Sequence, residues 1–364
     1  MKRKILIPLA ILVVIIAAIA IYFTQKPKEP ETIKIGAILP LTGELSFFGE
    51  GDRNALLIFQ EQNPDVKFIF EDSKGTPKDG LNAANKLVAQ GIKYYITSLS
   101  YIVNTIQPVF NKYGYLNITL NMDPRSEMES KYCMRLYVTF YDEMDKLIEL
   151  SNKLKVKRVA VLYVNVESMH NAVENYLRKR LSEMDVELYS ETYDIGTRDF
   201  KDLLLKLDKY KPQILRILDF GDKLNIILKQ IYEGRLFLNS ILLSGVETLL
   251  SDYKQFPSII TKKFFFTIPD LLIDEKNPFV QLYSKKYGKS PSYDAVFAYD
   301  IAQLLVPFIR KYGYNNVDKV IQEIIRMKEF VGAAAKYKIN EYGGISPAIS
   351  WAKIEDGNII KINP

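Results

Sequence analysis

Cysteine and histidine are nearly absent from this chain of 364 residues. Cys133 is the only cysteine, so no internal disulfide bond can form, and stability has to come from packing. Its apolar and aromatic sequence neighbours indicate a buried small hydrophobic residue rather than a nucleophile. His170 is the only histidine, and a lone histidine with no Cys near it is poor evidence for a metal site or a general base, so we expect a surface or helix-capping position.

Sequence motifs of common enzyme classes are also missing. The chain contains no P-loop, no G-x-S-x-G and no H-E-x-x-H pattern. The run Gly49-Glu-Gly51 lacks the third glycine of a dinucleotide fingerprint and has Asn54 in its place. Without a catalytic constellation, we expect no enzymatic activity, no cofactor and no metal ion.

Charge of one sign is not concentrated anywhere in the body of the chain. The 49 basic and 43 acidic residues are interleaved, and three of the basic ones lie within the first four positions. A nucleic-acid-binding protein would need a clustered basic face, so we expect no nucleic-acid partner. The composition, 48% hydrophobic and 25% charged, is typical of a folded globular protein.

An apolar segment stands at the start of the chain. Lys2, Arg3 and Lys4 precede residues 5–23, which carry no charge and are long enough to cross ~30 Å of hydrocarbon as a helix. Residues 1–23 are therefore a membrane anchor or a signal sequence. We expect an uncleaved transmembrane helix with the soluble body on the external face of the cell membrane, and cleavage after Ala20 is the alternative.

A short tether and a two-lobed body follow. Residues 24–31 contain Pro27 and Pro30 among mixed charges, as an extended linker does. Roughly 330 residues remain. A single hydrophobic core rarely supports so many residues, so this length favours two lobes.

The body alternates short aliphatic runs with helical patterns. This βαβα order predicts parallel sheets covered by helices, an α/β fold with ligands at the carboxyl ends of the strands. A second series of strands begins near Arg158. The expected strands span residues 33–39, 66–71, 94–97, 116–120, 158–163, 186–192, 214–218, 241–243 and 263–267.

Several separated landmarks along the body point to one family. In residues 32–51 a β-branched run stops at Pro40 and is followed by a Gly-rich turn and a helical pattern from about Asp52. Further landmarks are Phe70-Glu-Asp-Ser-Lys-Gly-Thr-Pro77, Gln107-Pro108, Tyr113-Gly114-Tyr115, Cys133-Met-Arg135, Thr197-Arg-Asp-Phe200 and Phe330-Val-Gly332 with Tyr337 and Gly343. In this order the body resembles the type I periplasmic binding proteins, specifically the branched-chain amino-acid (Leu/Ile/Val) binding family of ABC transporter substrate-binding proteins.

The resemblance implies a fold of two doubly wound parallel-sheet lobes. It also implies a hinge of three chain crossings, which we place near Phe140, Asp270 and Ala348. Residues 32–140 and 271–347 would form lobe 1. Residues 141–270 and 348–364 would form lobe 2.

The resemblance also implies ligand contacts in the first lobe. An aromatic residue before the glycine that closes the first loop corresponds to Phe48, followed by Gly49. The turn that holds an amino-acid carboxylate corresponds to Ser98, Ser100 and Tyr101, at a helix start whose free N–H groups favour an anion.

Two further segments carry the remaining implied contacts. Asn121 and Met122 occupy the place of a backbone contact, but the family's hydroxyl there is missing because this segment is one residue shorter. In the second lobe a family tyrosine corresponds to Phe220, and an acidic residue for the ligand ammonium corresponds to Glu247. The family's Tyr-Gly-x-Gly is replaced by Ser168-Met-His-Asn171. The resemblance therefore supports the receptor architecture more strongly than it supports a branched-chain ligand.

Structural interpretations stand beside these assignments. Phe48 can cover a ligand or belong to the core, and Glu247 can face a ligand or be a solvated loop carboxylate. Asp72 is better explained as a loop acid or helix cap than as a cleft residue. Asp219 ends a strand, and it can serve a ligand or cap the helix that begins at Lys223.

The sequence thus predicts an extracytoplasmic solute-binding receptor. It would capture a small polar ligand, an amino acid or an amide-like molecule, between two lobes and deliver it to an ABC permease. The alternative is a ligand-binding sensory domain that reports to a signalling partner.

Overall fold

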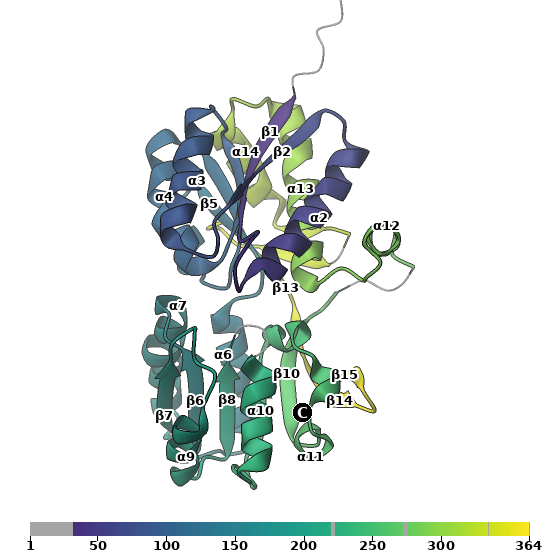
Figure 1. Ribbon diagram of the computed structural model, residues 1–364. Coiled ribbons are helices and arrows are strands. Elements are labelled where there is room, and N and C mark those ends of the chain that lie inside the picture. Colours follow the sequence, from purple (N-terminus) through teal and green to yellow (C-terminus); the bar gives the residue numbers. More distant parts are fainter. Residues whose placement is uncertain (1–31, 220–222, 272–275, 334, 364) are drawn as a thin grey trace, which may run out of the picture.

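The computed structural model describes residues 32–219, 223–271, 276–333 and 335–363. These residues form two α/β lobes, which lie one above the other in Figure 1. No helix within the described ranges is long and apolar enough to cross a membrane. The expected anchor, residues 1–23, and the tether, residues 24–31, lie outside the described residues.

The first lobe is built on a sheet of eight strands. Helices α3 and α4 cover one face of this sheet and α2 and α13 the other (Figure 1). The strands, in spatial order, are β11 (Glu329–Val331), β12 (Lys336–Ile339), β13 (Gly344–Pro347), β5 (Cys133–Leu136), β4 (Leu116–Leu120), β3 (Tyr94–Ser98), β1 (Ile33–Leu39) and β2 (Val66–Asp72). The helices are α2 (Ser46–Gln62), α3 (Pro77–Ala89), α4 (Ser100–Tyr113), α5 (Arg125–Met128), α12 (Pro278–Tyr287), α13 (Tyr293–Tyr312) and α14 (Val317–Met327).

The second lobe is built on a sheet of seven strands. In spatial order they are β15 (Asn358–Ile362), β14 (Ile349–Glu355), β10 (Phe264–Pro269), β9 (Ile241–Ser244), β8 (Ile214–Leu218), β6 (Arg158–Val164) and β7 (Glu187–Tyr193). Its helices are α6 (Phe140–Lys153), α7 (Glu167–His170), the π-helix η1 (Asn171–Leu177), α8 (Arg178–Ser182), α9 (Lys201–Lys209), α10 (Lys223–Glu233), the 3₁₀ turns η2 (Val246–Leu250) and η3 (Tyr253–Gln255), and α11 (Ser258–Thr261).

Both sheets are mixed, which corrects the expectation of parallel sheets. Strands β1 to β4 and β6 to β10 pair in parallel as expected, and β5, which was not expected, adds another parallel strand. Strands β11, β12, β14 and β15 add antiparallel pairs at the edges. The reason is a short connection: Asp356 and Gly357, with φ of +50° and +75°, form the turn between the paired residues Glu355 and Asn358. A two-residue turn of this kind closes an antiparallel hairpin, whereas a parallel pair needs a long crossover.

Local sequence signals explain where the elements that surround the cleft begin and end. Strand β1 stops before Pro40, which has no N–H to continue a ladder. Thr139 and Asp142 form a capping box at the start of α6, and the side chain of Ser292 accepts a hydrogen bond from the N–H of Ala295 at the start of α13. Gly114 ends α4 in the left-handed conformation.

The chain passes between the two sheets three times. It goes from β5 to β6, from β10 to β11 and from β13 directly to β14. The lobe boundaries expected from the resemblance stay a prediction, but these passages lie around the same places in the sequence.

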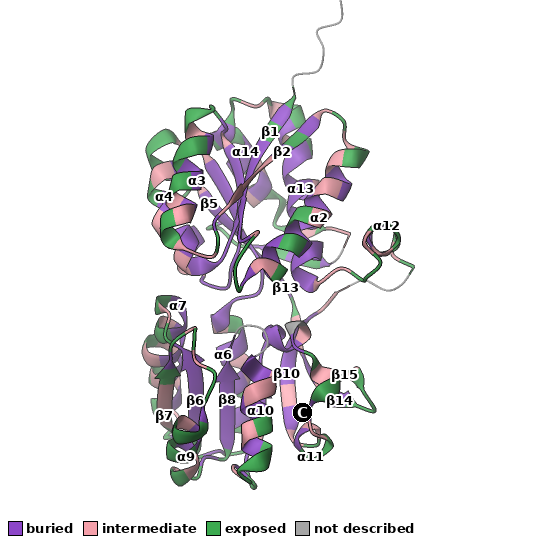
Figure 2. Cartoon of the chain, in the orientation of Figure 1, coloured by how far each residue is buried: buried purple, intermediate pink, exposed green. Residues whose placement is uncertain are grey.

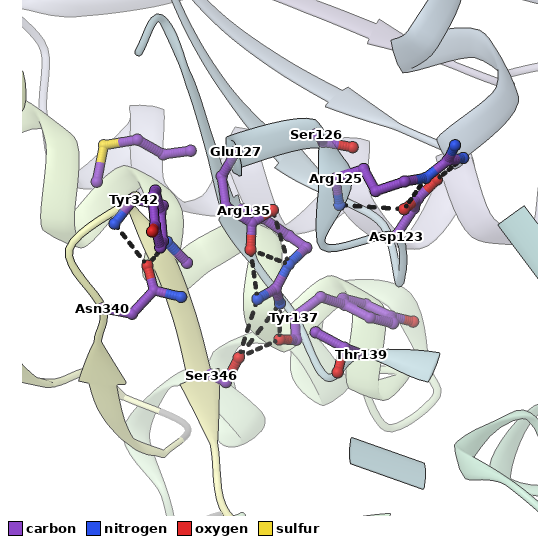
Figure 3. Close-up of polar contacts among 12 residues, drawn as sticks. Asp123, Arg125, Ser126, Glu127, Arg135, Tyr137, Thr139, Asn340, Tyr342 and Ser346 are labelled. Atoms are coloured by element: carbon purple, nitrogen blue, oxygen red, sulfur yellow. Dashed lines mark hydrogen bonds and ion pairs between the residues drawn. The ribbon is translucent and has the colours of Figure 1, made fainter. Parts of the chain in front are cut away.

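A buried ion pair supports the first passage (Figure 3). The Arg135 guanidinium on β5 lies 2.9 Å from the Glu127 carboxylate on α5, and both side chains are almost fully buried. Arg135 also donates to the carbonyl of Tyr137 and to the hydroxyl of Ser346 on β13. The pair therefore joins three segments at the base of the connection between the lobes.

The central strands of both sheets are buried (Figure 2). Strands β3, β4, β5 and β8 are buried along their whole length, as expected for strands covered on both faces. The exposed residues concentrate on the outer faces of the helices and on the edge hairpins. Cys133 is fully buried in this interior, where burial raises the pKa of its thiol well above the usual range.

Candidate functional site

A cleft lies between the lobes at the carboxyl ends of the strands. The space that the centre of a water-sized molecule can occupy in it is about 40 Å³, and the space free of protein atoms, open solvent included, is about 520 Å³. Most of its wall comes from the first lobe, and Glu247 is contributed by the second. The lining residues are Phe48, Asp52, Ser98, Leu99, Ser100, Tyr101, Leu120, Asn121, Met122, Tyr137, Phe140, Glu247, Tyr293 and Asp294.

The lobes touch each other at the rim of this cleft. The hydroxyl oxygens of Ser100, on α4, and Ser168, on α7, lie 2.9 Å apart, and both residues are buried. Nearby, Arg125 donates to the Glu167 carboxylate at 3.0 Å. The structure thus has its two lobes in contact, a geometry in which a molecule in the cleft would meet both of them.

The start of α4 presents hydrogen-bond donors to the cleft. Leu99, between β3 and α4, has a φ of +70°, a left-handed backbone that leucine rarely adopts and that costs roughly 1 kcal/mol or more. No side chain caps this helix, and the N–H of Ile102 already donates to the Leu99 carbonyl at 3.0 Å. Ser100 and Tyr101 are therefore the first-turn residues whose N–H groups have no acceptor within the helix. Ser98 adds a hydroxyl that is 4% exposed and has no hydrogen-bond partner among the described residues.

Two residues expected to contact the ligand in this region are engaged inside the protein. The Tyr101 hydroxyl donates to the Gly75 carbonyl at 3.0 Å, so its ring, not its hydroxyl, is available to the cleft. The Asn121 amide donates to Thr119 and Ser126 at 3.1 and 3.2 Å. Asn121 therefore braces the loop after β4.

Met122 and Phe140 close the wall beside that loop. The Met122 carbonyl accepts a hydrogen bond from the N–H of Phe140 at 3.0 Å, and both side chains line the cleft. This contact ties the end of β4 to the start of α6, where the chain enters the second lobe. Met122 thus offers the ligand a side chain, while its carbonyl is already engaged.

Glu247 is a buried acid rather than a solvated loop residue. It is 4% exposed, and neither carboxylate oxygen has a hydrogen-bond partner in the described part of the chain. Burial and then the charge of Glu143 raise the pKa of Glu247 well above its usual range, and Arg216 opposes this shift. Arg216 itself lies 2.5 Å from Glu143, which also accepts hydrogen bonds from Thr267 and the N–H of Val246.

Gly245 allows the two acids to approach. A Cβ atom at this position would lie 2.4 Å from a carboxylate oxygen of both Glu143 and Glu247, closer than real contacts permit. The glycine after β9 is therefore required by the packing around Glu247.

A second pair of acids in the cleft was not expected from the sequence. Asp52 on α2 and Asp294 on α13 are 1% and 3% exposed. Gly51 lets these helices pack closely, because a Cβ there would lie 2.8 Å from the Ser292 hydroxyl oxygen. Burial raises the pKa of Asp294 to about 7, and burial and then the Asp294 charge raise the pKa of Asp52 well above its usual range.

One sequence signal points to Asp52. It lies on the same face of α2 as Ala55, Leu56 and Phe59, which are buried. A charged residue within an apolar helical stripe is uncommon and marks a position worth attention. Asp294 gave no such signal, because an acid in the first turn of a helix is common for reasons of helix polarity.

Phe48 and Gly49, at the start of α2, differ in what they contact. Phe48 lines the cleft, is 8% exposed and belongs to a buried apolar cluster with Leu45 and Leu99, so it is part of both cleft and core. Gly49 is not among the lining residues. A Cβ at Gly49 would lie 2.3 Å from the carbonyl oxygen of Pro40, so this glycine allows α2 to pack against the end of β1.

The other candidates have structural partners or fall outside the described residues. Phe220 lies outside the described residues. The Asp219 carboxylate accepts a hydrogen bond from the Tyr193 hydroxyl at 2.7 Å. Asp72 accepts hydrogen bonds from the N–H groups of Leu41 and Lys74 and so acts as a loop acid.

His170 lies on the surface, in agreement with the sequence interpretation. It is exposed, and its Nδ1 lies 3.3 Å from the Tyr163 hydroxyl oxygen.

Comparison with known proteins places the chain in a family. A model of the family described as "Periplasmic binding protein" matches residues 32–358. A leucine-, isoleucine-, valine-, threonine- and alanine-binding protein of Pseudomonas aeruginosa is 22% identical over 347 residues, which cover 90% of this chain and 91% of that protein.

Solved structures agree on the fold. A leucine binding protein of Thermotoga maritima superposes with a TM-score of 0.78 at 21% identity and covers 91% of this chain and 98% of its own. A solute binding protein of an ABC transporter from R. palustris, in complex with 4-hydroxybenzoate, has a TM-score of 0.79 at 16% identity, with 91% and 96% covered. The chain therefore belongs to the type I periplasmic binding proteins, a family of solute-binding proteins rather than enzymes, and its resemblance to the branched-chain amino-acid-binding members is confirmed.

Proposed function

We propose that this protein is an extracytoplasmic solute receptor that captures a small polar ligand, an amino acid or an amide-like molecule, between its lobes. The observation that carries the proposal is the pair of buried, unpartnered polar groups that face one cleft from opposite lobes. Ser98 lies beside the uncapped start of α4, and Glu247 comes from the second lobe. Buried polar groups without partners are uncommon in native proteins and call for an explanation.

These groups match the two ends of an amino acid. The free N–H groups of α4, with Ser98 and Ser100, suit a carboxylate, and Glu247 suits an ammonium group. Phe48 and Tyr101 add apolar surface that would cover the ligand. The similarity to receptors for leucine and for 4-hydroxybenzoate supports the carboxylate end, because both molecules carry a carboxylate.

Binding would act on the arrangement of the lobes. A ligand that touches both lobes stabilises the closed form by the free energy of those contacts, and it shifts a hinge equilibrium without any covalent step. The closed receptor would then deliver its ligand to an ABC permease. We further propose that residues 1–23 hold the receptor at the external face of the cell membrane.

Glu247→Gln tests the site. If Glu247 pairs with an ammonium group, this change should weaken binding by roughly 1.5–3 kcal/mol, the contribution of a hydrogen bond to a charged group. The unliganded protein should stay at least as stable, because an unpaired buried carboxylate is removed. Titration calorimetry and thermal unfolding measure the two effects.

A matched control and a screen complete the experiment. Glu233→Gln changes an exposed acid of the same lobe and should leave affinity unaltered. The ligand should be found by thermal shift in a panel of amino acids, amides, short peptides and nucleosides, since a ligand at 100 times its Kd adds about 2.7 kcal/mol of stability. A panel without any shift would count against the receptor function.

A further inference from the structure

Asp52 and Asp294 place two buried carboxyl groups in the cleft that the proposed function does not use. Each side chain is more than nine-tenths buried and lines the cavity. Asp294 accepts a hydrogen bond from the Tyr137 hydroxyl through one oxygen, and its other oxygen has no partner among the described residues. One oxygen of Asp52 also lacks a described partner.

No basic side chain balances these acids. The described lining residues include Asp52, Asp294 and Glu247 but no Lys, Arg or His. The Arg216 guanidinium lies 2.5 Å from Glu143 and partly balances Glu247. It is not among the described residues that line the cleft beside Asp52 and Asp294. Burial of uncompensated carboxylates is costly, so the cleft favours either protonated acids or a cation that enters with the ligand.

Independent observations indicate that an organic ligand supplies the cation. Ser98, on a different element, also presents an unpartnered buried hydroxyl to the same cleft. The described residues offer no group of three His, Cys, Asp or Glu that could hold a metal ion. Tyr137 and Tyr293, whose ring centroids are 5.9 Å apart, line the wall beside Asp294, and such rings attract ammonium and guanidinium groups.

We propose that the ligand is an amino acid with a second cationic nitrogen on its side chain. Its carboxylate would lie at the start of α4 and its α-ammonium group at Glu247, as in the proposed function on which this inference rests. The side-chain cation would lie between Asp52 and Asp294. The acids of α2 and α13 then act as the specificity determinants of the first lobe.

Lysine and norleucine form the decisive pair of probes, because norleucine has the same carbon chain without the terminal ammonium group. The whole protein should bind lysine roughly 10- to 100-fold more tightly than norleucine, the range for a hydrogen bond between charged groups. In Asp294→Asn and in Asp52→Asn this preference should fall by about tenfold or more. Glu61→Gln, which alters an exposed acid of α2, should keep it.

Two more probes define the rest of the ligand. Arginine tests a guanidinium in place of the ammonium group, and putrescine tests two cations without a carboxylate. Arginine binding that weakens in Asp294→Asn supports the inference, whereas putrescine binding more tightly than lysine overturns the assignment of an amino acid. Thermal unfolding of each variant without ligand confirms that it is folded.

Failure of this inference differs from failure of the receptor function. If norleucine or another neutral amino acid binds as tightly as lysine and loses affinity in Glu247→Gln, the receptor function stands and the second cation is refuted. If lysine binds preferentially but the preference is unchanged in both Asp variants, the inference is also refuted. If no member of the panel binds at all, both proposals fail.

Discussion

Three buried carboxyl groups that line the cleft are the most informative residues of this protein. Asp52, Asp294 and Glu247 all have pKa values raised by burial, and all three line one cleft. Such groups destabilise the unliganded fold, and proteins accept that cost at functional sites. At the scale of single residues, the proposed ligand would therefore explain why the protein keeps acids that lower its stability.

Asp294 makes stability depend on pH in a defined direction. Burial raises its pKa to about 7 in the folded state, against about 4 in the unfolded chain, so the folded state holds the proton more tightly. The contribution of Asp294 to the free energy of unfolding is therefore greatest below about pH 4. This contribution, on the order of 1–4 kcal/mol, is lost as the pH rises through about 7. Asp294→Asn should flatten this slope, and urea unfolding between pH 4 and pH 8 measures it.

Other titratable groups near Asp294 also affect how the stability of the protein changes with pH. Asp52, Tyr137 and Tyr293 face Asp294 from α2, from the segment after β5 and from its own helix. The comparison is therefore made between wild type and variant, with Glu61→Gln as the control that should keep the wild-type slope. An Asp294→Asn protein with an unchanged slope would contradict the raised pKa.

At the scale of elements, close backbone approaches position the cleft. Gly49 lets α2 begin against Pro40, Gly51 lets α2 pack on α13, and Gly245 lets Glu143 and Glu247 share one corner of the second lobe. In each case a Cβ atom would lie under 3.0 Å from a neighbouring atom. The packing around the cleft thus depends on glycine at these three positions, where a larger residue would force its neighbours to move.

Gly49→Ala tests this dependence. The new Cβ would lie 2.3 Å from a backbone carbonyl oxygen of Pro40, so α2 or the end of β1 has to move. We expect a loss of roughly 1–3 kcal/mol in the free energy of unfolding, the range for overpacking, together with weaker ligand binding. Denaturant unfolding and ligand titration measure the two changes.

Gly196 provides the matched control, because a Cβ there meets no atom within 4 Å and its backbone does not require glycine. Gly196→Ala should stay within about 0.5 kcal/mol of wild type. Equal effects at the two positions would show that close packing at Gly49 is not the cause.

At the scale of the whole molecule, the proposed function depends on how the two lobes are connected and on where the protein is held in the cell. The lobes already meet at Ser100 and Ser168, and the chain passes between them three times. Several connections of this kind restrict the relative motion of lobes to a hinge more than a single linker would. The proposed anchor would keep such a receptor close to its permease.

The anchor proposal predicts how the protein fractionates. With residues 1–23 retained, the chain in membrane fractions should begin at Met1. Detergent should release it and high salt should not, since burial of apolar surface in lipid is not screened by ions. Sequencing of the amino terminus gives the answer, and a mature protein that begins at Ile21 would refute retention of the anchor.

Local patterns in the sequence determined the framework of the protein. Runs of β-branched residues, separated by segments with helical periodicity, located nine of the strands that pair in parallel. Local patterns suffice for this because the repeat of a strand or a helix depends on residues close together in the chain. The same kind of signal was present for the last hairpin, since Asp356-Gly357 is a two-residue turn pair, although the edge strands were not expected. Membership of the family also followed from spaced local landmarks.

Only the tertiary structure decided the chemistry of the cleft. Asp52 meets Asp294, and Glu143 meets Glu247, through the packing of elements that are far apart in the chain. The pKa of each acid depends on burial and on those neighbours, which periodicity along the chain does not encode. Sequence therefore sufficed for the lobes and for a receptor fold, and the folded arrangement was needed to show that the cleft is acidic.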